Sequence, residues 1–326
     1  MPRAGETFSA LLATGRVANI PTVCSNVLAG YWLAGLITAK HYPESQGFTA
    51  QSPLLIWLML MTSAIYVGGC MLGDAMDAEF DRQHRPQRPI PSGILSAHSV
   101  QRGAVILLAT AVIGLTISSH LCTGLQADIA VILSLLTLVV ITYAVRHKKN
   151  KVVALLLMAS CRFFLVLMAI AAGWGILDDS RVDSFSNIAY LTNGMVILPL
   201  GVGCYTLLLS WVASTESRPG VFKSRNILAC GLLLLPAMTV LLLILAFGSM
   251  PVDISAMVLA LVILYLWLGS ALIIIRKSKP AFVSRALAGF CLLDACFLAP
   301  FAPGMATVCL CLFVLALLMQ RLTPAT

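Results

Sequence analysis

Apolar runs long enough to cross a lipid bilayer recur from one end of this 326-residue chain to the other. A membrane-spanning helix needs about 20 mostly apolar residues, and a helix satisfies its own backbone hydrogen bonds inside lipid. Hydrophobic residues make up 60% of the sequence and charged residues only 10%, whereas an average soluble domain is about a quarter charged. The sequence therefore predicts an all-α polytopic membrane protein and excludes a water-soluble globule.

Nine of the apolar runs are predicted to be transmembrane helices. They cover residues 16–38, 52–74, 99–118, 125–145, 152–174, 188–213, 226–248, 253–275 and 303–320. A tenth stretch, 282–299, holds Arg285 and Asp294 and ends at Pro300. It is predicted to be an interfacial or re-entrant helix, with ten spans as the alternative. No low-complexity linker divides the sequence, so we expect a single domain over residues 1–326.

Lysine and arginine residues fall mainly on alternate loops. With the amino terminus in the cytoplasm, 17 of the 21 lie on cytoplasmic loops, as the positive-inside rule requires. This topology explains the net charge of +8 without nucleic-acid binding. The expected partners are membrane lipids and an anionic substrate on the cytoplasmic side, and the sequence indicates no protein partner. We expect an integral protein of a bacterial inner (plasma) membrane.

The charged stretch GDAMDAEFD, residues 73–81, follows directly on an apolar run. Asp74, Asp77 and Asp81 have the spacing i, i+3, i+7, which places them on one face of a continuous helix. Like charges this close repel each other unless a cation compensates them. Mg²⁺ prefers oxygen ligands and keeps coordination positions for phosphate oxygens. The stretch therefore predicts a magnesium site, and the alternative is a solvated helix end that pairs with nearby arginines.

The segment RPQRPIPSG, residues 85–93, cannot continue that helix, because its prolines fix φ and lack N–H groups. It presents Arg85 and Arg88 beside the carboxylates. Guanidinium groups next to a metal site favour a diphosphate ligand, since metal and arginine share its negative charge. The basic stretch YAVRHKKNK, residues 143–151, is a second candidate contact through Lys148, although ordinary positive-inside topology is its alternative.

Polar residues inside the predicted spans are further candidates. Arg162 lies within an apolar run, where a charge is costly unless it faces the bundle interior and finds a partner. Arg162 is therefore a candidate functional residue, and pairing with a helix-end carbonyl or one of the Asp residues is the alternative. Arg16 and Asn19 lie at the start of the first span and could contact diphosphate or acceptor, or form interhelical hydrogen bonds. Glu216 is the one acidic residue in the third cytoplasmic region, residues 205–226.

These motifs resemble the UbiA superfamily of intramembrane prenyltransferases. The first signature of that family, NDxxDxxxD followed by an RPxxRPIPSG-like loop, is matched by residues 74–93, with Gly73 in place of the leading asparagine. Tyr143 and the basic residues after it match a tyrosine-basic motif before the fifth helix. The second signature, DxxxD, falls on Ala213 and Ser217. The opening RVANIPTVCSNVLAG is similar to a divergent branch, the UbiA-like proteins of bacterial ebo-type operons.

The resemblance implies a UbiA-like bundle with cytoplasmic active-site loops. Its implied reaction is the Mg²⁺-dependent transfer of a prenyl group from an isoprenoid diphosphate to a small-molecule or lipid acceptor, often aromatic. The implied catalytic residues are Asp77, Asp81 and Arg162, and Asp74 joins the two aspartates as metal ligand. The implied diphosphate contacts are Arg85, Arg88, Lys148 and Arg16, and those at the acceptor or second site are Asn19, Glu216 and Tyr143. The alternatives are a non-catalytic isoprenoid- or lipid-binding or transport protein and a generic channel.

Overall fold

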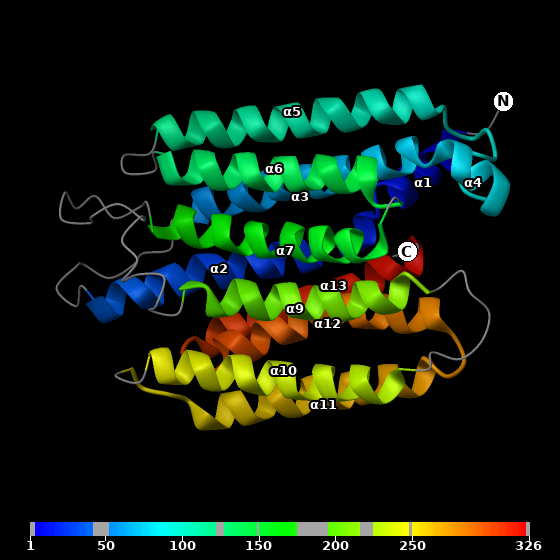
Figure 1. Cartoon of the computed structure of the whole chain (residues 1–326). Helices are drawn as coiled ribbons and strands as arrows, with labels where there is room; N and C mark the ends of the chain where they lie inside the picture. The colour runs from blue at the N-terminus through cyan, green and yellow to red at the C-terminus, as the bar shows by residue number, and fades with distance from the viewer. Residues whose placement is uncertain are drawn as a thin grey trace.

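Helices account for the regular secondary structure in the described part of the chain. The computed structural model describes residues 4–41, 52–121, 127–148, 150–174, 195–215, 224–247 and 250–323. Their helices are α1 (Ala4–Thr14), the 3-10 helix η1 (Val17–Asn19), α2 (Ile20–His41), α3 (Ser52–Met76), α4 (Ala78–His84), α5 (Ala97–Leu121), α6 (Ala127–Arg146), α7 (Lys151–Trp174), α9 (Ile197–Ala213), α10 (Arg225–Ala246), α11 (Ile254–Ile274), α12 (Lys279–Leu298) and α13 (Pro303–Leu322). The long helices lie side by side in one bundle (Figure 1).

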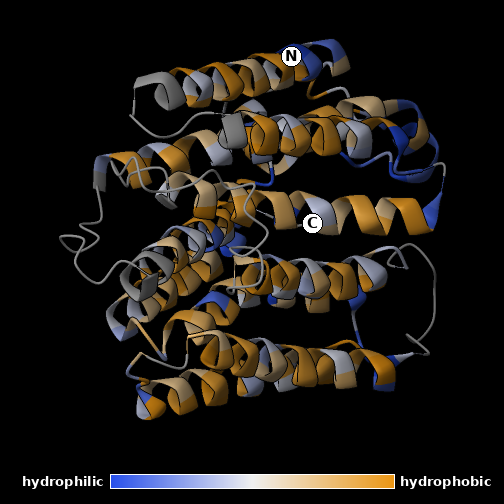
Figure 2. Ribbon diagram, turned by 60° about the vertical axis from the view of Figure 1, so that its left-hand side comes forward, coloured by the Kyte–Doolittle hydropathy of each residue, from blue (hydrophilic) through white to orange (hydrophobic). Residues whose placement is uncertain are grey.

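Seven of the described helices are long and apolar enough to cross a membrane: α3, α5, α7, α10, α11, α12 and α13. Shorter apolar helices in α6 and α9 accompany them. Figure 2 shows hydrophobic residues along most of each helix and hydrophilic residues gathered mainly toward the ends. The protein is therefore an all-helical integral membrane protein, which confirms the predicted class.

The stretch 282–299 corrects one prediction. It belongs to α12, a continuous 20-residue helix whose most apolar window is 78% buried inside the bundle, against 17–39% for the other six membrane-length helices. An interfacial or re-entrant placement is therefore wrong. Asp294 is tolerated because the side chains of Ser25 and Asn26 on α2 donate hydrogen bonds to it.

Helix α2 occupies the middle of the packing, because it contacts α3, α7, α12 and α13. Its closest approach is to α7. A Cβ atom at Gly30 would lie 2.7 Å from the backbone oxygen of Val166, and one at Gly173 would lie 2.9 Å from that of Tyr31. Small residues let two helix backbones approach this closely in a membrane, where van der Waals contact stabilises association. The positions of the polar residues on α2 relative to α7 are fixed by this contact.

Two helices at the carboxyl end begin at side-chain caps. Asp253 accepts a hydrogen bond from the backbone N–H of Ala256 at the start of α11, and Ser278 accepts one from Ala281 at the start of α12. Such caps satisfy N–H groups that have no partner within the helix. They define where each apolar segment begins.

One end of the bundle collects the charged segments. Helices α1 and α4 and the end of α13 lie together there (Figure 1). The same end carries the end of α3, the segment 85–96, the start of α5 and the connection from α6 to α7. The candidate site lies at this end.

Candidate functional site

The chain bends slightly in the middle of the acidic stretch. Helix α3 ends at Met76 and α4 begins at Ala78, with Asp77 between them at φ −87° and ψ −3°. Backbone hydrogen bonds still follow the i to i−4 pattern, from Asp77 to Gly73 and from Asp81 to Asp77. The expectation of one continuous helix is therefore corrected to two helices joined at Asp77, and the three carboxylates have two separate sets of cationic partners.

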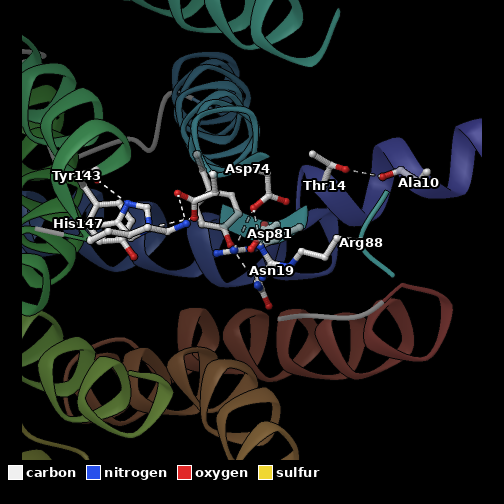
Figure 3. A network of polar contacts seen from close by, with 12 residues as sticks. Ala10, Thr14, Asn19, Asp74, Asp81, Arg88, Tyr143 and His147 are labelled. Carbon is white, nitrogen blue, oxygen red and sulfur yellow. Dashed lines mark hydrogen bonds and ion pairs between the residues drawn. The ribbon is translucent and has the colours of Figure 1, made fainter. Parts of the chain in front are cut away.

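Arg88 neutralises two of these carboxylates. Its Nη1 atom lies 2.8 Å from Oδ2 of Asp81 and 3.5 Å from Oδ1 of Asp74. Figure 3 shows the guanidinium group of Arg88 reaching both acids. The segment after α4 turns back to bring it there: the backbone N–H of Arg88 bonds to the oxygen of Arg85, and Gly93 takes a positive φ of 80°. The proline-rich segment therefore places a cation between two acids.

Arg16 approaches the same carboxylate oxygen of Asp74 as Arg88 does. Its Nη2 atom lies 3.6 Å from Oδ1 of Asp74. Arg16 stands between α1 and η1 with φ 47° and ψ 43°, the left-handed region that non-glycine residues rarely occupy. Backbone strain of this kind is found most often at functional positions. The tight connection between α1 and η1 thus directs a guanidinium group toward the acidic stretch.

Asp77 pairs with the carboxyl end of α6. Nζ of Lys148 lies 2.8 Å and Nε2 of His147 3.1 Å from its carboxylate oxygens. Lys148 also lies 3.7 Å above the ring of Phe80, and Tyr143 stacks on His147. Burial alone would raise the pKa of Asp77, but the hydrogen bonds from His147 and Lys148 outweigh it and lower that pKa. The Asp77 carboxylate is therefore held in its charged form.

The donor set suits a hard divalent cation. Three carboxylates face three permanently charged side chains, and the oxygens of Asp74 and Asp81 converge on a single cationic nitrogen of Arg88. Within the described residues, no group of three or more His, Cys, Asp or Glu side chains is arranged to hold a metal ion. The oxygen donors fit Mg²⁺ by their chemistry, while the ion pairs occupy them here. Arg85 forms no ion pair within the described ranges and is half-buried beside this cluster.

Arg162 lies deeper in the bundle and does not contact the acidic stretch. Its Nη1 donates to Oδ1 of Asn26 at 2.7 Å and to the backbone oxygen of Thr22, and Nη2 donates to Oγ1 of Thr22. The pairing with a backbone carbonyl corresponds to the alternative considered for it. The Arg162 guanidinium also lies 5.6 Å from the ring centroid of Tyr66, whose hydroxyl accepts a hydrogen bond from Asn19.

Three residues in or near these contacts were not among the predicted site residues. Tyr66 lies eight positions before Asp74 on α3. This is about two helical turns, so the sequence alone could have indicated that the two residues lie on similar faces of the helix. His147 lies within the basic stretch next to Lys148. Asp294 is an ionisable residue within an apolar run, which by default indicates a functional position. Glu216 and Ser217, from the predicted second site, lie outside the described residues.

A comparison with protein-family models decides the family. The model of the UbiA prenyltransferase family matches residues 26–293. The chain belongs to the UbiA prenyltransferase family. The resemblance drawn from the acidic and proline-rich motifs is thereby confirmed at the level of the family.

Relatives of known name match shorter parts of this UbiA-family chain. A digeranylgeranylglyceryl phosphate synthase of Methanoculleus marisnigri is 33% identical over 120 residues, 37% of this chain and 40% of that protein. The synthase of the same name from Sulfolobus acidocaldarius is 36% identical over 67 residues, 21% of this chain and 23% of that protein. The aligned parts thus span less than half the length of these relatives.

Two solved structures share the fold. One, described as giving structural and mechanistic insights into digeranylgeranylglyceryl phosphate synthase in membranes, has a TM-score of 0.55 at 17% identity and covers 95% of this chain and 99% of its own. The other is the apo structure of a UbiA homolog from Aeropyrum pernix K1, with a TM-score of 0.54 at 16% identity, covering 89% of this chain and 96% of its own. The UbiA-like bundle therefore extends over nearly the whole chain.

Proposed function

We propose that this protein transfers a prenyl group from an isoprenoid diphosphate to an acceptor inside the membrane. The observation that carries the proposal is the meeting of three carboxylates with Arg16, Arg88 and Lys148 at one end of an apolar bundle. A charged headgroup finds its counter-charges there, and an attached isoprenoid chain has apolar helices beside it. Family membership supports the same reaction class.

The proposed chemistry begins with the leaving diphosphate. Asp77 and Asp81, supported by Asp74, would hold Mg²⁺, which supplies positive charge to the departing group. Arg85 and Arg88 would bind the diphosphate beside the metal, and Arg16, next to Asp74, and Lys148, next to Asp77, would add further positive charge. Charge placed where it develops favours breaking of the allylic C–O bond. The apolar bundle excludes water from the resulting cation.

Two chemical classes of acceptor are suggested for this protein. The sequence resemblance favours an aromatic acceptor, whereas the synthases that match this chain are named for a glyceryl phosphate product, which is not aromatic. Asn19 and Tyr143 are proposed to lie on the acceptor side, with Arg162 deeper inside. Glu216 is proposed to contribute to a second site. The ebo-type branch is proposed from the opening motif of the first span.

We propose ten membrane crossings within a single domain over residues 1–326. Helices α2, α6 and α9 join the seven membrane-length helices to give this number. An even number of crossings agrees with α1 and the end of α13 lying at the same end of the bundle (Figure 1). We propose that this end faces the cytoplasm of a bacterial cell, with the protein in the inner membrane, because the basic loops gather there.

Release of diphosphate by the purified protein tests this function. Wild-type protein in lipid nanodiscs, given geranylgeranyl diphosphate and Mg²⁺ with a membrane lipid extract, is expected to release diphosphate and yield a prenylated lipid. Asp77→Asn and Asp81→Asn are each expected to lower release by about 100-fold or more, as for lost electrostatic stabilisation. Glu79→Gln is the matched control, because Glu79 is exposed and pairs only with Arg82 among the described residues.

Two results would contradict the proposal. Unchanged release in Asp77→Asn and Asp81→Asn would exclude the acidic stretch as the site. Saturable binding of the isoprenoid diphosphate without any release, across aromatic and glyceryl phosphate acceptors, would indicate a non-catalytic lipid binder instead.

A further inference from the structure

A cluster of polar side chains lies inside the bundle, between α2, α7 and α12. Arg162 on α7 donates to Asn26 on α2, and Asn26 donates through Nδ2 to Oδ2 of Asp294 on α12 at 2.7 Å. The hydroxyl of Ser25 donates to the same oxygen of Asp294. Arg162 is 6% exposed, and Asn26 and Asp294 are 0% exposed. The amide of Asn26 thus bridges a buried guanidinium and a buried carboxylate.

Hydrogen-bonding capacity is left over at both ends of this bridge. Oδ1 of Asp294 is buried and has no hydrogen-bond partner among the described residues. Arg162 has five N–H groups, and its three hydrogen bonds to Thr22 and Asn26 use three of them. A carboxylate oxygen buried without a donor is costly, so the cluster is incomplete as it stands.

Other polar side chains in the interior do not share this property. The buried threonines Thr14, Thr62, Thr206 and Thr239 each donate to a backbone oxygen four residues earlier in their own helix. Such bonds satisfy a hydroxyl locally and leave nothing to recognise a ligand. Oδ1 of Asp294 differs from these hydroxyls, because no donor among the described residues bonds to it.

The chemistry of the cluster selects a neutral group. A phosphate or carboxylate anion offers only acceptor oxygens, so it could use the donors of Arg162 but would leave Oδ1 of Asp294 without a donor. A hydroxyl group can donate to Oδ1 of Asp294 and accept from Arg162 at the same time. Aromatic rings adjoin the guanidinium, Phe290 at 4.7 Å and Tyr66 at 5.6 Å.

The cluster also has a suitable position relative to the charged end. Tyr66 adjoins Arg162 and accepts a hydrogen bond from Asn19, which follows Arg16 by three residues. Asn26 is seven residues beyond Asn19, about 10 Å further along the helix direction. A diphosphate held by Arg16 and the acidic stretch would direct its prenyl chain toward this apolar interior. The acceptor must reach the first carbon of that chain, which adjoins the diphosphate, while a hydroxyl group elsewhere on the acceptor can lie deeper in the bundle.

We propose that Asp294 and Arg162 form a buried recognition site for a neutral hydroxyl group of the acceptor, either an alcohol or a phenol. The inference rests on the proposed prenyl transfer and narrows its acceptor class. Asn26 and Ser25 hold the carboxylate in place and do not themselves contact the ligand.

Photolabelling of the full-length protein in nanodiscs tests the site. Three probes carry the same diazirine-bearing alkyl chain and end in an alcohol, a phenol or a phosphate monoester. The alcohol or the phenol is expected to label peptides containing Asn26, Arg162 or Asp294 at least five times more than the phosphate does. The better of the two neutral probes identifies the source of the hydroxyl.

Variants assign the labelling to the cluster. Asp294→Asn removes the acceptor charge without changing side-chain shape, and Arg162→Lys keeps the charge but removes the spare guanidinium donors. Each is expected to reduce labelling of these peptides at least five-fold while the melting temperature shows a folded protein. Asp253→Asn is the matched control, because Asp253 is an exposed helix cap and Asn also caps helices well.

Interior labelling that is absent in wild-type protein, or that is equal for the phosphate probe, would overturn the inference. So would equal labelling in a folded Asp294→Asn or Arg162→Lys variant. Diphosphate release from geranylgeranyl diphosphate, measured on the same wild-type preparation, reports on the proposed function separately. Release without interior labelling would leave prenyl transfer standing and remove only the hydroxyl site.

Discussion

The guanidinium group of Arg88 donates a 2.8 Å hydrogen bond to the carboxylate of Asp81, and Asp81 is almost completely buried. Removing Arg88 would leave this carboxylate without its strongest partner, beside the second carboxylate of Asp74. We expect Arg88→Ala to lower the free energy of unfolding by about 1–3 kcal/mol, because an unpaired buried polar group carries its full desolvation cost. Thermal unfolding in detergent measures this change.

Arg82→Ala is the matched control for that substitution. Arg82 pairs with Glu79 on the same helix, and both side chains are more than half exposed. Exposed pairs of this kind contribute little, so a change within about 0.5 kcal/mol is expected. Equal destabilisation by the two substitutions would contradict the structural role assigned to Arg88.

Lys148→Met tests the predicted contact between Lys148, the partner of Asp77, and the diphosphate. Nζ of Lys148 is 2.8 Å from Asp77, and the substitution removes its charge while keeping an apolar side chain near Phe80. We expect the KM for geranylgeranyl diphosphate to rise by about 10-fold, the scale of one lost charge-assisted hydrogen bond. Lys277→Met, at an exposed position before α12, should leave KM unchanged. A similar KM for the Lys148 variant and wild type would remove Lys148 from the diphosphate contacts.

The acidic stretch shows what spacing can and cannot predict. The positions of Asp74 and Asp81 relative to Arg88 followed from local rules, since a helix face and a proline-rich turn are properties of short segments. The separate pairing of Asp77 with Lys148 and His147 did not, because it depends on where α6 ends relative to α3. Sequence spacing carries no information on that distance.

The placement of the helix that contains Asp294 could not be predicted from the sequence for a similar reason. Arg285, Asp294 and Pro300 made the stretch 282–299 look unsuited to a full membrane span. The residues that accommodate it, Ser25 and Asn26, lie more than 260 positions earlier on α2. Hydropathy records the cost of a buried charge but not the partner that offsets it. Arg162 was likewise correctly expected to face the interior, although its partners Thr22 and Asn26 could not be named from sequence.

Magnesium removal should abolish turnover without unfolding the protein. Arg88 and Lys148 already neutralise the carboxylates of Asp81 and Asp77 in the absence of a metal. A chelator is therefore expected to reduce diphosphate release to background and to shift the melting temperature only slightly, unlike proteins whose fold depends on metal. Added Mg²⁺ should restore release, and Na⁺ at equal ionic strength should not. Full activity in the chelator would contradict the magnesium site.

Gly30 should be a stringent position for packing between α2 and α7. A Cβ atom there would lie 2.7 Å from the backbone oxygen of Val166 and 2.9 Å from Cβ of Ala169, so neither neighbour can yield by a side-chain rotation. We expect Gly30→Ala to lower the free energy of unfolding by about 1–3 kcal/mol through overpacking. Displacement of α2 would also move Asn26 relative to Arg162, so photolabelling of the buried cluster should fall in parallel.

Gly269→Ala in α11 provides the comparison for this prediction. A Cβ atom at Gly269 would meet nothing within 4 Å, so the substitution adds no contact. Alanine is the better helix former by about 1 kcal/mol, and the variant should be as stable as wild type or slightly more so. Thermal unfolding of the two variants in the same detergent separates packing from helix propensity. Equal stability of Gly30→Ala and Gly269→Ala would contradict the conclusion that close contact between α2 and α7 fixes the positions of the polar residues on α2.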